Sequence, residues 1–215
     1  MARRITLSML FLFMLGITSN AQQWDKYMPE KGRKSIVNKA RRVSGVGAAM
    51  AGHIALAIWI TDPVARAFVS DAIDKERLTP DEAETRYRQL RPEGSIAFLI
   101  DARRQTANKP FGNTKASTLD DPLVAAETFL QRADDRNTFS KAEVADHKFE
   151  INLGSFFRPG DLQSVYRVVF PRVDRQGKPI IRDLSDKIEI QFNLAGKKIV
   201  LDYKVKEVVS RLEDL

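Results

Sequence analysis

The chain has 215 residues, of which 43 % are hydrophobic and 29 % are charged, fractions that are typical of a globular protein of roughly one domain. It contains no cysteine, which excludes disulfides, thiol nucleophiles, iron–sulfur clusters and cysteine-ligated zinc. His53 and His147 are the two histidines, too few for a histidine-rich metal site within one chain. The formal net charge is +7.

Residues 1–21 have the three parts of a secretory signal peptide. An arginine pair forms the basic start, Ile5–Ile17 forms the apolar centre, and Ser19-Asn20-Ala21 supplies small residues at the first and third positions before the cleavage point. The apolar segment is shorter than the roughly 20 residues of a membrane-spanning helix. We therefore predict cleavage after Ala21, which leaves no transmembrane span, and export to the periplasm or the extracellular space. Cleavage lowers the formal charge from +7 to +5.

Residues 22–42 are predicted to form a basic N-terminal arm. Basic clusters near a terminus attach to polyanions such as acidic glycans or lipid headgroups, or else stay solvated. Trp24 and Tyr27 lie upstream of most of the basic residues, so no stacking platform for bases is interleaved with them. Export also separates the chain from nucleic acid, which we do not expect as a partner. The candidate polyanion-binding residues are Lys31, Arg33, Lys34, Lys39, Arg41 and Arg42.

The uncharged segment Val43–Ile60 allows several interpretations. If this segment and the apolar N-terminal segment both spanned the membrane, the basic arm between them would lie outside the cell. This would contradict the tendency of Lys and Arg to stay on the cytoplasmic side. A dinucleotide-binding fingerprint at Gly45-Val46-Gly47 lacks a preceding strand, and Met50 stands where its third glycine belongs. A buried strand over His53–Ile60 fits best; because it is apolar on both faces, both must be covered. The glycines before it would then mark a bulge or a close approach of two backbones.

Three pairs of residues predict helix starts, because each places a capping oxygen before a proline at the first helical position. The pairs at Asp62-Pro63 and Thr79-Pro80 predict a helical hairpin over residues 62–91, in which Glu82 completes a capping box with Thr79. The third pair, Asp121-Pro122, predicts a helix over about 122–133. A single helical turn is predicted to begin at Ser140.

Alternating apolar residues predict the strands that make up most of the remaining chain. They lie at Ile96–Asp101, Lys148–Leu153, Val165–Val173 and Lys187–Leu194, and the last of these returns through Ile199–Val205 as a hairpin. A sheet with one apolar face requires a second layer. We therefore expect one α+β domain over residues 43–215. It would be an antiparallel β-sandwich-like domain of about six or seven strands, with the helical hairpin inserted between the first two strands.

Motifs of catalysis and metal binding are absent from the sequence: it has no GxSxG, SxxK, Walker, HExxH or EF-hand pattern. Asp134-Asp135-Arg136-Asn137 matches a calcium loop only loosely, and we interpret it as a polar loop. Asp146-His147 is the one acid–histidine neighbour pair, but neighbours in a strand point to opposite faces. We expect no cofactor and no metal.

These observations favour a non-enzymatic interaction or structural module of the cell envelope. Its partner would be another envelope protein or an anionic envelope polymer. One alternative is a secreted hydrolase that uses carboxylates and His147. The other is a binder of an anionic envelope polymer or a membrane surface through the basic N-terminal arm.

Overall fold

The structure is a computed structural model, and it describes residues 45–50, 53–104, 117–118, 127–151, 163–194 and 196–212. The predicted signal peptide, the basic N-terminal arm and the pair Asp121-Pro122 lie outside these ranges.

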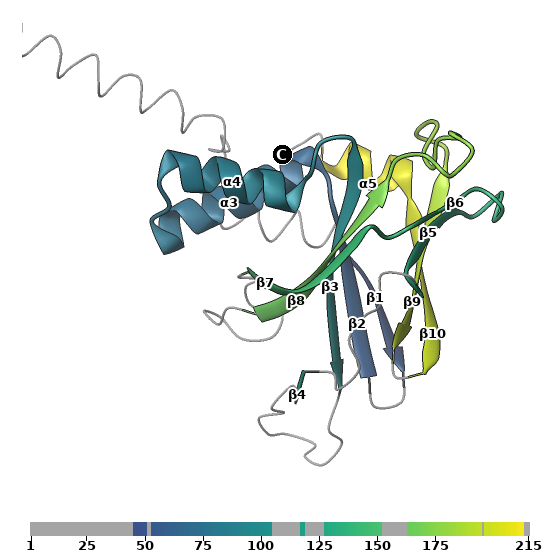
Figure 1. The fold of residues 1–215 in the computed structure, drawn as a ribbon, viewed down its shortest axis with the longest axis horizontal. Coiled ribbons are helices and arrows are strands. Elements are labelled where there is room, and N and C mark those ends of the chain that lie inside the picture. The colour runs from purple at the N-terminus through teal and green to yellow at the C-terminus, as the bar shows by residue number, and fades with distance from the viewer. Residues whose placement is uncertain are drawn as a thin grey trace, which may run out of the picture.

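Two antiparallel sheets dominate the described residues (Figure 1). The six-stranded sheet has the order β1-β2-β3-β8-β7, with β4 added to β3, and the four-stranded sheet has the order β10-β9-β5-β6. The strands of the first sheet are β1 (Gly45–Met50), β2 (His53–Ile60), β3 (Ser95–Arg104), β4 (Ser117–Thr118), β7 (Val144–Ile151) and β8 (Gln163–Pro171). Those of the second are β5 (Phe129–Arg132), β6 (Phe139–Lys141), β9 (Lys187–Leu194) and β10 (Lys197–Lys204). The helices are α3 (Asp62–Glu76), α4 (Pro80–Leu90) and α5 (Val205–Leu212).

This arrangement confirms the predicted α+β, sandwich-like fold. The helical pair α3–α4 connects β2 to β3, the two strands that the sequence places first. The strands are more numerous than six or seven, because β1 precedes β2 and because the chain also forms the short strands β4, β5 and β6.

Both faces of β2 are covered, as its apolar sequence predicts. One face carries Trp59 beside Phe98 of β3, and their ring centroids lie 6.1 and 5.4 Å from that of Tyr203 in the second sheet. Neighbouring residues point to the opposite face, where Arg167 of β8 donates a 2.9 Å hydrogen bond from Nη1 to the carbonyl of Gln89 in α4. The six-stranded sheet therefore lies between the helical pair and the four-stranded sheet, as Figure 1 also shows.

The two sheets are joined by a buried hydrogen bond as well as by apolar packing. The Tyr203 hydroxyl of β10 donates to the carbonyl of Ala57 in β2 over 2.6 Å. Tyr203 is 1 % exposed, so this bond is shielded from water. It fixes the position of one sheet relative to the other at the centre of the core.

The segment before β2 is the first strand of an antiparallel pair, in which Gly47 lies opposite Leu56. A Cβ atom added at Gly47 would lie 3.3 Å from the carbonyl oxygen of Ala55. The prediction of a close backbone approach is thus confirmed, whereas the transmembrane-helix and dinucleotide-fingerprint interpretations are wrong. Among the described helices, none combines the length and the apolar character needed to cross a membrane.

The caps of the helical hairpin agree with the sequence at α4 and differ at α3. Thr79 Oγ1 accepts from the backbone N–H of Glu82, and the Glu82 carboxylate accepts from the backbone N–H of Thr79 at 2.7 Å, which confirms the capping box. At α3 the N-cap residue is Thr61, and its side chain makes no capping bond. Asp62, predicted to be the cap, lies one residue inside the helix. Its carboxylate is therefore available for contacts with other side chains.

Two predicted helical segments are strands instead. Residues 129–132 of the helix expected over 122–133 form β5, which pairs with both β6 and β9. Leu130 and Arg132 are buried and alternate with half-buried neighbours, which is the period of a strand. The helical turn expected at Ser140 is likewise wrong, because Ser140 lies in β6. Pairing along both edges satisfies the backbone of β5, and this tertiary context outweighs the helical spacing of its apolar residues.

Candidate functional site

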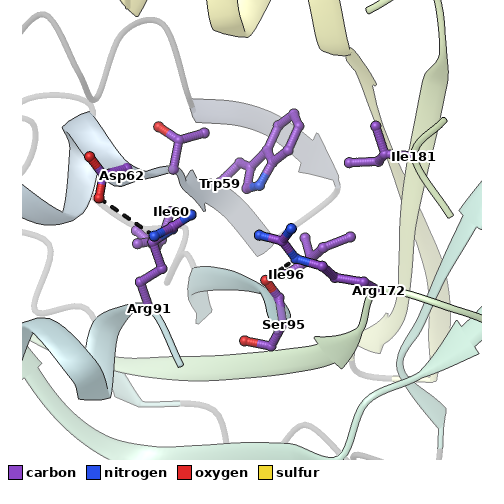
Figure 2. A pocket seen from close by; sticks show the side chains of 9 residues that line it. Trp59, Ile60, Asp62, Arg91, Ser95, Ile96, Arg172 and Ile181 are labelled. Atoms are coloured by element: carbon purple, nitrogen blue, oxygen red, sulfur yellow. Dashed lines mark hydrogen bonds and ion pairs between the residues drawn. The ribbon is translucent and has the colours of Figure 1, made fainter. Parts of the chain in front are cut away.

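A cleft of about 240 Å³ opens where the end of β2, the start of α3, the residue after α4, the start of β3 and the segment after β8 meet. Figure 2 shows the side chains around it. It is lined by Trp59, Ile60, Thr61, Asp62, Arg91, Ser95, Ile96, Arg172 and Ile181.

The apolar wall of the cleft is built from strand residues that belong to the core. Trp59, Ile60 and Ile96 are all at most 7 % exposed. Trp59 is further fixed by stacking against Phe98, with 6.2 Å between the ring centroids. Ile181 adds a fourth apolar side chain, which packs on the edge of the same core. Trp59, Ile60 and Ile96 belong to β2 and β3, so the sheet holds this part of the wall in place.

Asp62 organises the polar side of the cleft. Its Oδ2 accepts from Arg66 Nε at 2.8 Å, and its Oδ1 accepts from the Tyr87 hydroxyl and lies 3.5 Å from Arg91 Nη1. Burial, followed by the hydrogen bond to this carboxylate, raises the pKa of Tyr87. The phenol therefore stays protonated at neutral pH and donates to Asp62. The start of α3 is thereby tied to the end of α4, where Arg91 follows the helix.

Two guanidinium groups reach the cleft, and their bonds to the protein are long. Arg91 Nη1 lies 3.5 Å from Asp62 Oδ1 and 3.4 Å from the Tyr87 hydroxyl, whereas Arg172 Nε lies 3.4 Å from the carbonyl oxygen of Ser95. Charge-assisted hydrogen bonds of this kind are ordinarily about 2.7–2.9 Å long. In these bonds Arg91 uses Nη1 and Arg172 uses Nε. In Figure 2 the two groups enter from different sides, Arg91 beside Asp62 and Arg172 beside Ser95 and Ile96.

The segment after β8 is folded back by a turn at residues 174–177. Asp174 Oδ1 accepts from the backbone N–H groups of Gln176 and Lys178 at 2.8 Å each, and Gly177 takes a positive φ of 78°. The backbone N–H of Ile180 then donates to the carbonyl of Arg172 over 2.9 Å. This bond fixes the backbone that carries the second guanidinium group.

The far end of this segment is held by Asp186, whose side chain is 2 % exposed. Its carboxylate accepts from Arg182 Nη2 at 2.6 Å and from the backbone N–H groups of Arg182 at 2.6 Å and Asp183 at 3.2 Å. The bonds from Arg182 lower the pKa of Asp186 to about 2. The carbonyl of Asp186 also accepts from the backbone N–H of Val205, which begins α5. The residue Ile181 is thereby fixed between two anchored points.

Two hydroxyl-bearing residues complete the cleft. Ser95 Oγ donates to the carbonyl of Pro92 over 2.7 Å, which stabilises the turn between α4 and β3. Thr61 Oγ1 is buried and has no hydrogen-bond partner. The cleft thus combines an apolar wall, two guanidinium groups and one hydroxyl group whose hydrogen-bonding capacity is unused. Chemically, the guanidinium groups are suited to hydrogen bonds with anionic oxygens.

None of the site residues singled out from the sequence lines this cleft. The six basic residues of the arm lie outside the described residues. His147 lies in β7, where the pairing with β8 shifts register between Asp146 and Phe149, and β7 supplies none of the lining residues. The proposed hydrolase pairing of His147 with carboxylates is therefore not assembled at the cleft.

Sequence reasoning missed Arg91 and Arg172, although a signal was present. Each stands next to a proline, in Arg91-Pro92 and Pro171-Arg172, at the point where a helix or a strand ends. Proline stops regular structure, so the side chain beside it lies at the rim of a layer. The signal in the sequence is therefore an arginine beside a proline at the end of a helix or strand.

The acidic loop at 134–135 is a polar loop, as predicted. Asp134 pairs with Arg132 at 2.6 Å, and Asp135 accepts from the Thr138 hydroxyl at 2.7 Å. In the part of the chain that the structure describes, no group of three or more His, Asp or Glu side chains is placed to hold a metal ion.

Comparisons with models of protein families, with curated proteins and with solved structures give no match for this chain. Its function is therefore argued from the cleft, in which two guanidinium groups lie over a wall of core residues.

Proposed function

We propose that the chain is a non-enzymatic binding module, exported to the cell envelope, that recognises its partner through the cleft beside Arg91 and Arg172. The observation that carries this proposal is the combination of two weakly bonded guanidinium groups with an apolar wall that the core holds in place. Concave sites that combine an apolar surface with a few converging polar groups are typical of ligand binding.

The contacts of the other polar residues support binding in preference to catalysis. The Ser95 hydroxyl donates to a backbone carbonyl, and a serine nucleophile would donate instead to a basic side chain. The Tyr87 phenol remains protonated, because its pKa is raised, and the Asp62 carboxylate that accepts its hydrogen bond also faces Arg66 and Arg91. Each of these groups positions its neighbours.

The proposal is tested by screening purified protein against a set of small acids, amines and neutral compounds with NMR. We expect amide shifts to change at the cleft, around Trp59, Ser95 and Arg172, while the compounds themselves stay chemically unchanged. Turnover of an ester or amide that is lost in a His147→Ala variant would refute the proposal and favour the secreted hydrolase. Binding that leaves the cleft signals unchanged would also refute it.

Export is tested separately, by the mass of the N-terminal peptide of the protein recovered from the envelope or the medium. We expect a chain that begins at Gln22. A chain that still begins at Met1 would overturn the predicted localisation, with no effect on the argument for the cleft.

A further inference from the structure

The geometry of the cleft points to its ligand: we infer that it binds a monocarboxylate attached to an apolar group, with the carboxylate between Arg91 and Arg172. This inference deepens the proposed function and rests on it. It names the chemistry that the cleft selects.

The charge of the ligand follows from the side chains around the cleft. Two guanidinium groups and one carboxylate line it, so its lining is positively charged. The carboxylate of Asp62 is already engaged by Arg66 at 2.8 Å and by the Tyr87 hydroxyl. An anion is therefore attracted to the cleft, whereas a cation would face both arginines without a free counter-charge. The planar fork of arginine matches the two oxygens of a carboxylate.

The apolar part follows from the wall and from the volume. Trp59, Ile60 and Ile96 are at most 7 % exposed, so the apolar surface of the cleft is the small exposed part of these side chains together with half-buried Ile181, which suits a short apolar group. The volume of the cleft is about 240 Å³. This is below the roughly 300–1,000 Å³ of sites for drug-sized ligands. A short aliphatic or aromatic group suits a cleft of this size.

Two sources can supply this chemistry. One is a free organic acid, and the other is the C-terminal carboxylate of a peptide that ends in an apolar residue. Both place the same atoms against the arginines and the wall, and the experiment below includes probes that distinguish them.

The readout is the fluorescence of Trp59, which lies in the wall. The chain has two tryptophans, so a Trp24→Phe background leaves Trp59 as the sole indole. The probe is 4-phenylbutyrate, and its neutral amide, its amine analogue and inorganic phosphate serve as comparisons. A tripeptide ending in leucine, with its C-terminus free or amidated, represents the second source. Calorimetry on the same protein checks each affinity.

The matched variants are Arg172→Gln and Arg175→Gln. Both residues are exposed and lie in the same segment, but only Arg172 lines the cleft. We expect the acid to bind about tenfold more tightly than its amide, and Arg172→Gln to remove about the same factor. Arg175→Gln is expected to leave the affinity unchanged. Since neither residue belongs to the core, both variants are expected to fold.

The outcomes separate the inference from the proposed function. Equal affinity for the acid and the amide, tighter binding of phosphate, or equal losses in the two variants would overturn the inference while leaving a binding cleft. If no probe of any charge changes the Trp59 signal, the inference and the cleft as a binding site both fail. Preference for the free tripeptide over phenylbutyrate would assign the ligand to a peptide C-terminus, and the reverse to a small acid.

Discussion

Asp186→Asn tests whether the charge of Asp186 fixes the segment that carries Arg172 and Ile181. The substitution keeps the shape of the side chain and removes its ion pair with Arg182. The pKa of Asp186 is lowered from 3.8 to about 2, and a shift of this size corresponds to about 2.5 kcal/mol at neutral pH. Because the Arg182 side chain is 46 % exposed, water screens part of this interaction. We therefore expect the free energy of unfolding to fall by about 1–2 kcal/mol.

The pH dependence of this loss identifies its cause. A carboxyl group whose pKa is lowered by folding stabilises the protein above its unfolded pKa of 3.8, and this stabilisation is lost as pH falls through about 2. The difference in the free energy of unfolding between wild type and Asp186→Asn is therefore constant above about pH 5 and roughly halved at pH 3. Urea denaturation followed by circular dichroism at pH 7, 5 and 3 measures it. Asp202→Asn, at an exposed carboxylate of β10, is the control, with little change expected. A difference that is equal at pH 7 and pH 3 would refute the charge argument.

Three further predictions concern the sheets and the arm. Tyr203→Phe should lower the free energy of unfolding by about 1–2 kcal/mol in urea denaturation, because the carbonyl of Ala57 loses its 2.6 Å donor in a buried place; no loss would mean that this bond does not stabilise the contact between the sheets. Leu130→Ala should cost about 2–5 kcal/mol in the same assay, since Leu130 is fully buried. A smaller loss than for Phe129→Ala, at the half-buried neighbour, would contradict the placement of β5. For the arm over residues 22–42, replacement of its six candidate cations by Gln should abolish retention on anionic vesicles. Retention of the unmodified chain that does not weaken between 50 and 500 mM salt would count against an electrostatic attachment.

The parts of the fold that the sequence predicts are those whose information is local. Thr79, Pro80 and Glu82 lie within four positions, and together they specify the start of α4 without help from the rest of the chain. The hairpin of β9 and β10 is equally local, because alternation on both sides of Gly196 sets the pairing and the buried face. Predictions of this kind hold because every determinant is nearby.

β5 shows where local information is insufficient. Its residues Phe129 and Leu130 match a helical stripe and a strand about equally well over so short a segment. Pairing with β9, which lies about 60 positions later in the chain, makes this segment a strand; Leu130 lies opposite Ile190. Phe139 of β6 lies against Phe129 across the strand pair, with 6.0 Å between the ring centroids. Pairing between distant strands cannot be read from one segment alone.

The cleft depends still more on distant contacts. Its lining extends from Trp59 to Ile181, and it forms because β2 and β8 end, and β3 begins, at the same end of one sheet. The sequence predicts that Asp62 begins a helix, and this is correct to within one residue. It does not reveal that the carboxylate turns away from the cap toward Tyr87 and Arg91, because both partners belong to the end of the next helix.

The two arginine–carboxylate contacts near the cleft differ in a way that bears on function. Arg182 meets Asp186 at 2.6 Å with a nearly buried carboxylate, which is the geometry of a pair that stabilises the fold. Arg91 meets Asp62 at 3.5 Å, and both side chains are about one-third exposed. An ion pair that only stabilised the fold would be expected to have the closer geometry of Arg182 and Asp186. The Asp62 carboxylate instead makes its close ion pair with Arg66, at 2.8 Å. A loosely held guanidinium contributes little to stability but retains donors for a ligand. The loose pair lines the cleft while the tight pair anchors the segment behind it, and this division is what a preformed anion-binding site requires.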